Sequence, residues 1–134
     1  MANALYPKWK EQLLQFTANN NLSAGTVKVA LIDTGTYTYN SANQFWSSAS
    51  AASVGTPQTI GTKTFTNGTF SGGNVTFTAV TGASIAALII YIDTGTAATS
   101  PLVSYIDTSV TGLPVTPNGG DISITWNASG IFTL

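Results

Sequence analysis

The first regular hydrophobic pattern in the chain lies near its N-terminus. Between Pro7 and Asn19, the apolar residues Trp9, Leu13 and Phe16 recur at the spacing of one helix face, with polar residues between them. Proline suits the first turn of a helix, and asparagine tolerates the backbone conformation that often follows a helix end. The pattern therefore predicts one helix over residues 7–19, whose apolar stripe packs on the rest of the protein.

From Thr26 onward the pattern changes to the two-residue alternation of β-strands. The segment 84–93 is apolar on both faces, which predicts a central strand covered from two sides. Asn67-Gly68 lies between two alternating segments and predicts a tight hairpin turn. The expected strands are residues 26–33, 36–39, 59–66, 69–71, 74–80, 84–93, 102–107, 121–126 and 131–134.

The segment 41–53 interrupts this alternation. It is rich in serine and alanine, and Gln44-Phe45-Trp46 within it is typical of a short helical turn that carries two large aromatic residues. Gly55 and Pro57 follow, and both residues are common in turns. We therefore expect a loop here that ends at Gly55 and Pro57.

Together the elements predict one mainly β domain over residues 1–134. The length is that of a single domain, and the 43% apolar content is enough for a true hydrophobic core. Residues 1–25 are expected to form the short N-terminal α-helix and a linker. Residues 26–134 are expected to form an antiparallel β-sandwich, or a jelly-roll-like pair of sheets, because turn signals recur at short intervals.

Side chains that carry chemistry are rare in this sequence. Histidine, cysteine and arginine are all absent, which removes the usual general base, the usual thiolate nucleophile and the bidentate phosphate ligand. We therefore expect no enzyme activity, no catalytic residue, no cofactor and no metal site. The charged residues are Lys8, Lys10, Glu11, Lys28, Asp33, Lys63, Asp93, Asp107 and Asp121.

The charge balance also argues against two classes of partner. Four scattered lysines and a net charge of -1 offer no basic surface for nucleic acid or for a membrane. The longest apolar run, residues 86–92, is too short to span a bilayer, and the first residues do not resemble a secretory signal. We therefore expect a protein made and folded in a cytoplasm.

Threonine, serine and asparagine fill most of the polar positions. A surface of this kind can lie against another protein without the desolvation of charges, which favours self-assembly or docking on a larger body. The alternative is that threonine is frequent only because it suits β-strands. Composition alone does not separate these two interpretations.

Three of the expected strands end in Asp-Thr, at Asp33, Asp93 and Asp107. Aspartate at such a position accepts a hydrogen bond from a backbone N–H two residues later, so turn capping is the favoured interpretation. If the three carboxylates converged, they would offer oxygen ligands to a calcium ion. A glycosidase-like carboxylate pair is a weaker alternative.

Aromatic residues in and before the interrupted segment are the candidate binding residues. Phe45, Trp46, Tyr37 and Tyr39 could form a face for a protein or a sugar, because aromatic side chains dominate many interfaces. The alternative is that they fill the core or hold the loop in place. For Trp9 and Trp126 the core is the preferred interpretation.

The sequence resembles a group of small structural proteins of tailed bacteriophages and prophages. The resemblance extends over nearly the whole chain, and residues 94–121 are its most specific part because turns and strands follow in the same order. It departs after Phe45, where such proteins are often acidic but this chain has Trp46-Ser47-Ser48-Ala49-Ser50, so no contact residue is carried over. The similar segments are residues 1–6, 27–34, the segment around Phe45, 87–92, 94–102, 105–108 and 112–121.

The resemblance implies a non-enzymatic virion component, and among such components a capsid decoration (cement) protein. Its partner would be the major capsid protein, its location the capsid surface, and its state a closed homo-oligomer, with a trimer favoured. One alternative is a tail or tail-fibre-associated module that binds a host surface. Another is a carbohydrate-binding module that uses Tyr37, Tyr39 and Trp46.

Overall fold

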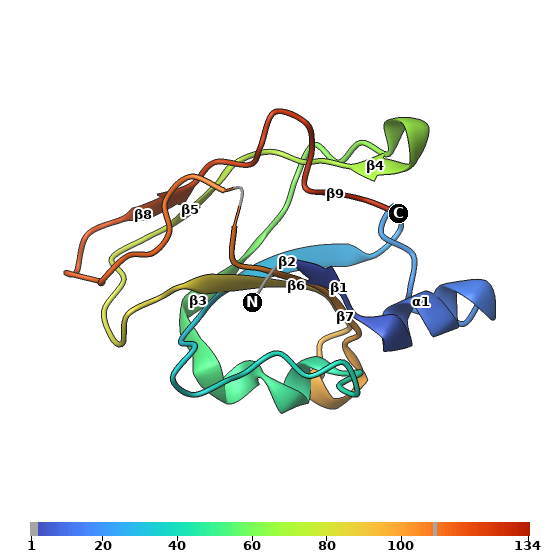
Figure 1. Cartoon of the computed structure of the whole chain (residues 1–134), viewed down its shortest axis with the longest axis horizontal. Helices are drawn as coiled ribbons and strands as arrows, with labels where there is room; N and C mark the ends of the chain where they lie inside the picture. Colours follow the sequence, from blue (N-terminus) through green and yellow to red (C-terminus); the bar gives the residue numbers. More distant parts are fainter. Residues whose placement is uncertain (1–2, 109) are drawn as a thin grey trace.

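A five-stranded antiparallel sheet forms the centre of the molecule (Figure 1). The structure is a computed structural model, and it describes residues 3–108 and 110–134; residues 1, 2 and 109, which belong to the predicted domain, lie outside this description. Every pair of neighbouring strands in the sheet is antiparallel. In sheet order the strands are β1 (Ala4–Leu5), β7 (Leu102–Ile106), β6 (Ala87–Asp93), β2 (Thr26–Ile32) and β3 (Ser53–Thr59).

Both faces of this sheet are covered. Figure 1 shows two ribbons above it, formed by β4 (Thr69–Phe70) with β9 (Phe132–Thr133) and by β5 (Val75–Phe77) with β8 (Ile122–Ile124). Below it lies a layer of loops and 3-10 turns. These turns are η1 (Trp46–Ser48), η2 (Ser50–Ala52) and η4 (Ala97–Thr99), while η3 (Thr66–Gly68) belongs to the upper layer.

The covering layers explain why the central strands are apolar throughout. In β6, every residue from Ala87 to Ile92 is buried, as the predicted central strand requires. In the ribbons, only the inward-facing residues are buried, and β5 and β8 alternate buried and exposed positions. The prediction of a mainly β, antiparallel fold with one α-helix, consistent with a β-sandwich, is therefore confirmed.

The helix is shorter than predicted. α1 covers Pro7–Leu14 and does not extend to Asn19. Trp9 is buried and Leu13 packs partly against the core, but Phe16 is almost fully exposed. The apolar stripe that packs on the core therefore ends at Leu13. Phe16 lies beyond the helix with a positive φ of 57°, and its side chain does not join the core.

The strand predictions need two corrections. Residues 36–39 form no strand, and the strand expected at 59–66 lies instead at Ser53–Thr59. Gly55 and Pro57, expected to close a loop, lie inside this edge strand. The pairing of β2 with β3 is irregular there: Val29 pairs with Gln58, but Leu31 pairs with Val54, so β3 contains extra residues between the two pairs. Such a bulge accommodates a glycine of positive φ and a proline without an N–H, so these residues mark an irregular edge rather than a loop.

The tight turn predicted at Asn67-Gly68 is confirmed, but it does not join the two expected strands: residues 60–66 form no strand beyond an isolated bridge at Thr64, and β4 pairs with β9. Asn67 and Gly68 have positive φ angles of 54° and 77°, and the Thr69 N–H donates to the Thr66 carbonyl. Thr64 and Ser71 exchange two backbone hydrogen bonds of 3.0 Å on either side of this turn. These are the features of the tight turn that Asn-Gly favours.

Candidate docking surfaces

Two of the predicted binding residues lie in a tyrosine cluster formed by Tyr6, Tyr37, Tyr39 and Tyr105. The Tyr6 and Tyr37 hydroxyls are 2.9 Å apart, and the Tyr37 hydroxyl donates to the Asn43 Oδ1 atom at 2.9 Å. The Tyr39 ring lies 5.1 Å from that of Tyr6 and 5.6 Å from that of Tyr105. Tyr6, Tyr37 and Tyr105 are buried, and Tyr39 is half-buried.

Burial alters the acid–base properties of this cluster. Desolvation is the main cause that raises the pKa of Tyr6, and its hydrogen bond to Tyr37 adds to the effect. Desolvation also raises the pKa of Tyr39 and that of Tyr105. Tyr6, Tyr39 and Tyr105 therefore keep their hydroxyl protons over the physiological pH range.

The other two predicted residues lie apart from this cluster. Trp46 stacks on Tyr91 with ring centroids 4.3 Å apart and planes 5° from parallel, and only 7% of Trp46 is exposed. Phe45 is half-buried and forms an antiparallel bridge with Pro101. Tyr37 and Trp46 thus pack inward against other aromatic rings, as the alternative of a core role predicts, and of the three residues considered for an aromatic face only Tyr39 is more than slightly exposed.

The three aspartates do not converge. β2 and β6 run antiparallel, with Thr26 opposite Asp93, so Asp33 and Asp93 follow opposite ends of the strand pair. The Asp33 Oδ1 atom accepts a hydrogen bond from the Gly35 N–H at 2.8 Å, and the Asp93 Oδ1 atom accepts one from the Gly95 N–H at 2.9 Å. Turn capping, the favoured interpretation, is therefore confirmed for both.

Each of these two aspartates has a further partner. The Thr36 hydroxyl donates to Asp33 at 2.7 Å, and this bond is the main cause that lowers the pKa of Asp33. Lys28 lies 2.8 Å from the Asp93 carboxylate, and this contact is the main cause that lowers its pKa. Over residues 3–108 and 110–134, no group of three or more acidic side chains is placed to hold a metal ion.

The outer side of the β5–β8 ribbon carries a row of hydroxyl groups, which we call the hydroxyl face: Thr76, Thr78, Ser123 and Thr125. All four side chains are exposed, while the alternate residues Val75, Phe77, Ile122 and Ile124 are buried. Thr76 and Ser123 lie opposite each other with their hydroxyl oxygens 3.4 Å apart. The inward residues thus leave four uncharged hydroxyl side chains on the outer side of the ribbon, and the exposed Asp121, whose Oδ1 atom accepts a hydrogen bond from the Ala79 N–H at 3.0 Å, lies at the end of this row.

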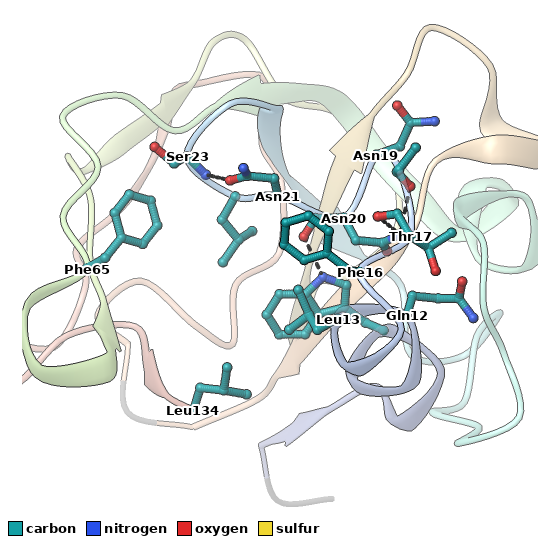
Figure 2. Close-up of a pocket in the computed structure, with 13 residues that line it drawn as sticks. Gln12, Leu13, Phe16, Thr17, Asn19, Asn20, Asn21, Ser23, Phe65 and Leu134 are labelled. Carbon is teal, nitrogen blue, oxygen red and sulfur yellow. Dashed lines mark hydrogen bonds between the residues drawn. The ribbon is translucent and has the colours of Figure 1, made fainter.

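A second surface is hollowed and apolar. A groove of about 520 Å³ lies between the end of α1, the loop that follows it, and the C-terminal segment. Figure 2 shows Phe65 and Phe16 on different sides of this groove, with Leu134 at its edge. We call it the apolar groove, and it is lined by Trp9, Gln12, Leu13, Phe16, Thr17, Ala18, Asn19, Asn20, Asn21, Leu22, Ser23, Phe65 and Leu134.

A run of aromatic rings supports the apolar groove. Trp9 meets Phe132 edge-on, with ring centroids 5.8 Å apart. The centroids of Phe132 and Phe70 are 5.3 Å apart, and those of the stacked pair Phe70 and Phe65 are 5.6 Å apart. The Trp9 indole N–H also donates to the Asn20 carbonyl at 3.2 Å, which fixes the loop after α1. These contacts join α1, the loop and the β4–β9 ribbon into one support.

Lys63 fixes the same loop from another direction. Its ammonium group donates to the carbonyl oxygens of Leu22 at 2.7 Å, Ser23 at 3.3 Å and Gly25 at 2.8 Å. Leu22 and Ser23 line the apolar groove, and Phe65 lies two residues beyond Lys63. One side chain therefore links two walls of the groove.

Phe16 occupies an unusual position at the end of α1. The Phe16 N–H donates to the Leu13 carbonyl, and the Thr17 N–H donates to the Gln12 carbonyl at 3.0 Å. This is the Schellman pattern, in which the residue of positive φ is usually glycine. Here that residue is a phenylalanine that is 96% exposed, and Leu14 beside it is 89% exposed.

Sequence reasoning found α1 but missed the apolar groove. It placed Phe16 on the buried stripe, and it did not single out Phe65 or Leu134, which are 41% and 66% exposed. These two residues reach the groove only through the tertiary fold, so no local pattern could have indicated them. The positive φ of Phe16 likewise has no signature in the sequence, since glycine or asparagine is the usual signal.

The two surfaces are built from uncharged residues. No charged side chain lines the apolar groove, and the four residues that define the hydroxyl face are threonine and serine. Within the described part of the chain, no helix has the length and apolar character needed to cross a membrane. No protein-family model matches this chain, and no curated protein matches it.

Proposed function

We propose that this chain is a non-enzymatic structural protein of a bacteriophage virion. It docks on the assembled capsid, with the major capsid protein as its partner, and stabilises the shell by bridging neighbouring capsid subunits. The resemblance of nearly the whole chain to such proteins supports the class of protein. The hydroxyl face is the observation that carries the docking mode.

The hydroxyl face suits a permanent contact with a large protein surface. Each hydroxyl can both donate and accept a hydrogen bond, so it can pair with polar groups of either kind on the partner. Its burial does not require the desolvation of a charge, which would cost several kcal/mol for each ion. The buried alternate residues of β5 and β8 hold the ribbon in place, so little backbone freedom is lost on binding.

Binding to emptied capsids tests this proposal. The purified chain should co-sediment with shells built from the major capsid protein of the same virion, and should raise the temperature at which those shells break open. Thr76→Lys should weaken binding by about tenfold or more, because it places an unpaired ammonium group in the contact. Thr56→Lys, at an exposed position on the edge strand β3, is the matched control and should bind as the wild type does.

Two results would count against the proposal. Wild-type chain that remains in the supernatant would overturn capsid docking itself. Equal loss of binding in Thr76→Lys and Thr56→Lys would overturn the assignment to the hydroxyl face while leaving capsid docking in place.

Electron microscopy of particles that carry a labelled chain separates this proposal from the tail alternative. Labels on the head are expected, and labels confined to the tail would favour the tail-associated module instead. Burial of Tyr37 and Trp46 leaves the carbohydrate-binding alternative without its stacking surface, so we expect no binding on a glycan array.

A further inference from the structure

A small hollow lies beside the tyrosine cluster, at the end of the central sheet that β7 reaches. Its volume is about 330 Å³. This volume is at the lower end of the range for small-molecule sites, so the hollow suits a small group rather than a large ligand. We call it the tyrosine pocket, and its walls include Thr34, Tyr37, Thr38, Tyr39, Tyr105 and Asp107.

Three aromatic rings contribute to these walls. The ring centroids of Tyr39 and Tyr105 are 5.6 Å apart with planes tilted by 51°, and those of Tyr37 and Tyr105 are 6.5 Å apart. Tyr39 is half-buried, whereas Tyr37 and Tyr105 are 7% and 3% exposed, so Tyr39 supplies most of the accessible ring surface. The face of a tyrosine ring attracts a cation within about 6 Å of its centroid. One small cation can therefore lie within that distance of both Tyr39 and Tyr105.

The walls also carry a negative charge. Asp107 is the one charged residue among those that line the tyrosine pocket, whereas the apolar groove has none. Burial is the main cause that raises the pKa of Tyr105, and the charge of Asp107 adds to this effect. The carboxylate thus acts electrostatically on a ring of the pocket. Its strand end is held in place, since the Asp107 backbone N–H donates to the Asn3 Oδ1 atom at 2.7 Å.

This combination selects among the classes of ligand. An apolar group in the tyrosine pocket would remove water from the Asp107 carboxylate without replacing its interactions, which is costly, and an anion would be repelled. A cation gains from the carboxylate and from the ring faces at once. The hydroxyl oxygens of Thr34 and Thr38, both exposed residues, can accept hydrogen bonds from its N–H or O–H groups.

We propose that the tyrosine pocket binds the alkylammonium group of an organic cation. The ring of Tyr39 packs on the alkyl part of this group, and Asp107 supplies the opposite charge. A free quaternary amine and the lysine side chain of a partner protein both present such a group. The inference goes beyond capsid docking and does not depend on the hydroxyl face.

A titration with choline and with its neutral tert-butyl analogue, in which carbon replaces the charged nitrogen, tests the proposal. The two molecules share their shape and their hydroxyl group, so a difference between them reports the charge alone. Binding is followed by NMR on the tyrosine ring signals, and those of Tyr39 are identified by their absence from Tyr39→Phe. Choline should bind about tenfold or more tightly than its analogue, and sodium chloride should weaken its binding.

Three variants locate the site. Tyr39→Leu keeps an apolar side chain but removes the ring, so it should weaken choline binding by about tenfold or more. Tyr39→Phe should bind choline as the wild type does, because the ring rather than the hydroxyl carries the interaction. Phe45→Leu, at a half-buried aromatic residue that does not line the tyrosine pocket, is the matched control and should leave binding unchanged. If Tyr39→Leu fails to fold, the comparison of choline with its analogue on the wild type still decides.

A third probe, the amide of Nα-acetyl-lysine, distinguishes the two sources of the ammonium group. Tighter binding of this probe than of choline would assign the pocket to the lysine side chain of a partner protein. Tighter binding of choline would assign it to a free quaternary amine, and either result supports the proposed site.

Three results would overturn the proposal. The first is equal binding of choline and its neutral analogue, which would show that the charge is not recognised. The second is a wild-type chain that binds neither choline nor the lysine derivative. The third is a loss of choline binding in Phe45→Leu as large as that in Tyr39→Leu, which would place the cation elsewhere on the molecule.

Discussion

The two ends of α1 treat their aromatic residues in opposite ways. At the N-terminal end, Tyr6 is fully buried, its ring packs against Tyr39, and its hydroxyl pairs with that of Tyr37. Beyond the C-terminal end, two residues after Leu14, Phe16 is almost fully exposed and held in a left-handed conformation. The residue before this short helix is thus part of the core, whereas the aromatic residue that follows the helix is not.

The difference separates an aromatic residue that is part of the core from one that is almost entirely outside it. Tyr6 has what an amphipathic aromatic side chain needs, namely an apolar environment for the ring and a partner for the hydroxyl. Phe16 has neither burial nor a relaxed backbone, although a glycine would form the same turn. Contiguous exposed apolar residues of this kind often mark interaction sites, whereas a single exposed leucine would carry no such meaning.

The largest expected effect comes from the deletion of the buried ring. Tyr6→Ala should lower the free energy of unfolding by about 3–5 kcal/mol, because it removes a fully buried aromatic side chain and leaves a cavity. Phe65→Ala, at an aromatic residue of the apolar groove that is 41% exposed, should lower it by less than about 1 kcal/mol. Urea unfolding of the three proteins, measured on monomers, makes this comparison. Similar losses for both variants would show that the two aromatic sites are equally part of the core.

A smaller effect is expected from the lysine that links the walls of the groove. Lys63→Met retains the length of the side chain but leaves the carbonyls of Leu22 and Gly25 without the ammonium donor, and should lower the unfolding free energy by about 1–3 kcal/mol. Lys10→Met, at an exposed position on α1, is the matched control and should change the unfolding free energy by less than about 0.5 kcal/mol. An unchanged unfolding free energy in Lys63→Met would show that the three hydrogen bonds of Lys63 contribute nothing to stability.

The contrast between the two ends of α1 also shows what the sequence could and could not predict. The burial of Trp9 followed from the helical period, and the central strand at 84–93 followed from its apolar residues on both faces. Both predictions rested on patterns that burial imposes directly on local sequence. The strand at Ser53–Thr59 was missed, since Gly55 and Pro57 are turn signals unless a bulged edge strand accommodates them.

The candidate surfaces were harder to predict for a related reason. The alternation of hydroxyl and apolar residues is visible in the sequence. The sequence does not show that residues 75–77 pair with residues 122–124, which brings the hydroxyl groups of two distant segments onto one surface. The apolar groove brings Phe65 and Leu134 beside residues 16–23, across distances in sequence that no local pattern spans. The sequence left Trp46 between a binding surface and the core, because the residue that covers it, Tyr91, lies in a distant strand.

A finer test concerns the hydroxyl group of Tyr6 alone. Tyr6→Phe keeps the buried ring and removes only the hydrogen bond to Tyr37, so it should lower the unfolding free energy by about 1 kcal/mol. Tyr37 retains Asn43 as its acceptor, which keeps the loss small. Urea unfolding at neutral pH measures the difference. A loss as large as that of Tyr6→Ala would contradict the assignment of most of the energy to the ring.

The smallest effect is one that is absent at neutral pH and develops only in alkali. Burial raises the pKa of Tyr6, Tyr39 and Tyr105 above the ordinary value, so their contribution to stability is complete below about pH 10. It is then lost as the pH rises from there toward the folded-state values, because the unfolded chain releases these protons first. The unfolding free energy should therefore stay level from neutral pH to about pH 9 and decline above about pH 10.

Two measurements check this prediction. The decline should be less steep in Tyr6→Phe, which has one such group fewer, and the part of the tyrosinate absorbance that Tyr6→Phe lacks should appear together with unfolding rather than before it. Early titration of Tyr6 in the folded protein would place its hydroxyl in contact with solvent, and the contrast between the two ends of α1 would then no longer hold.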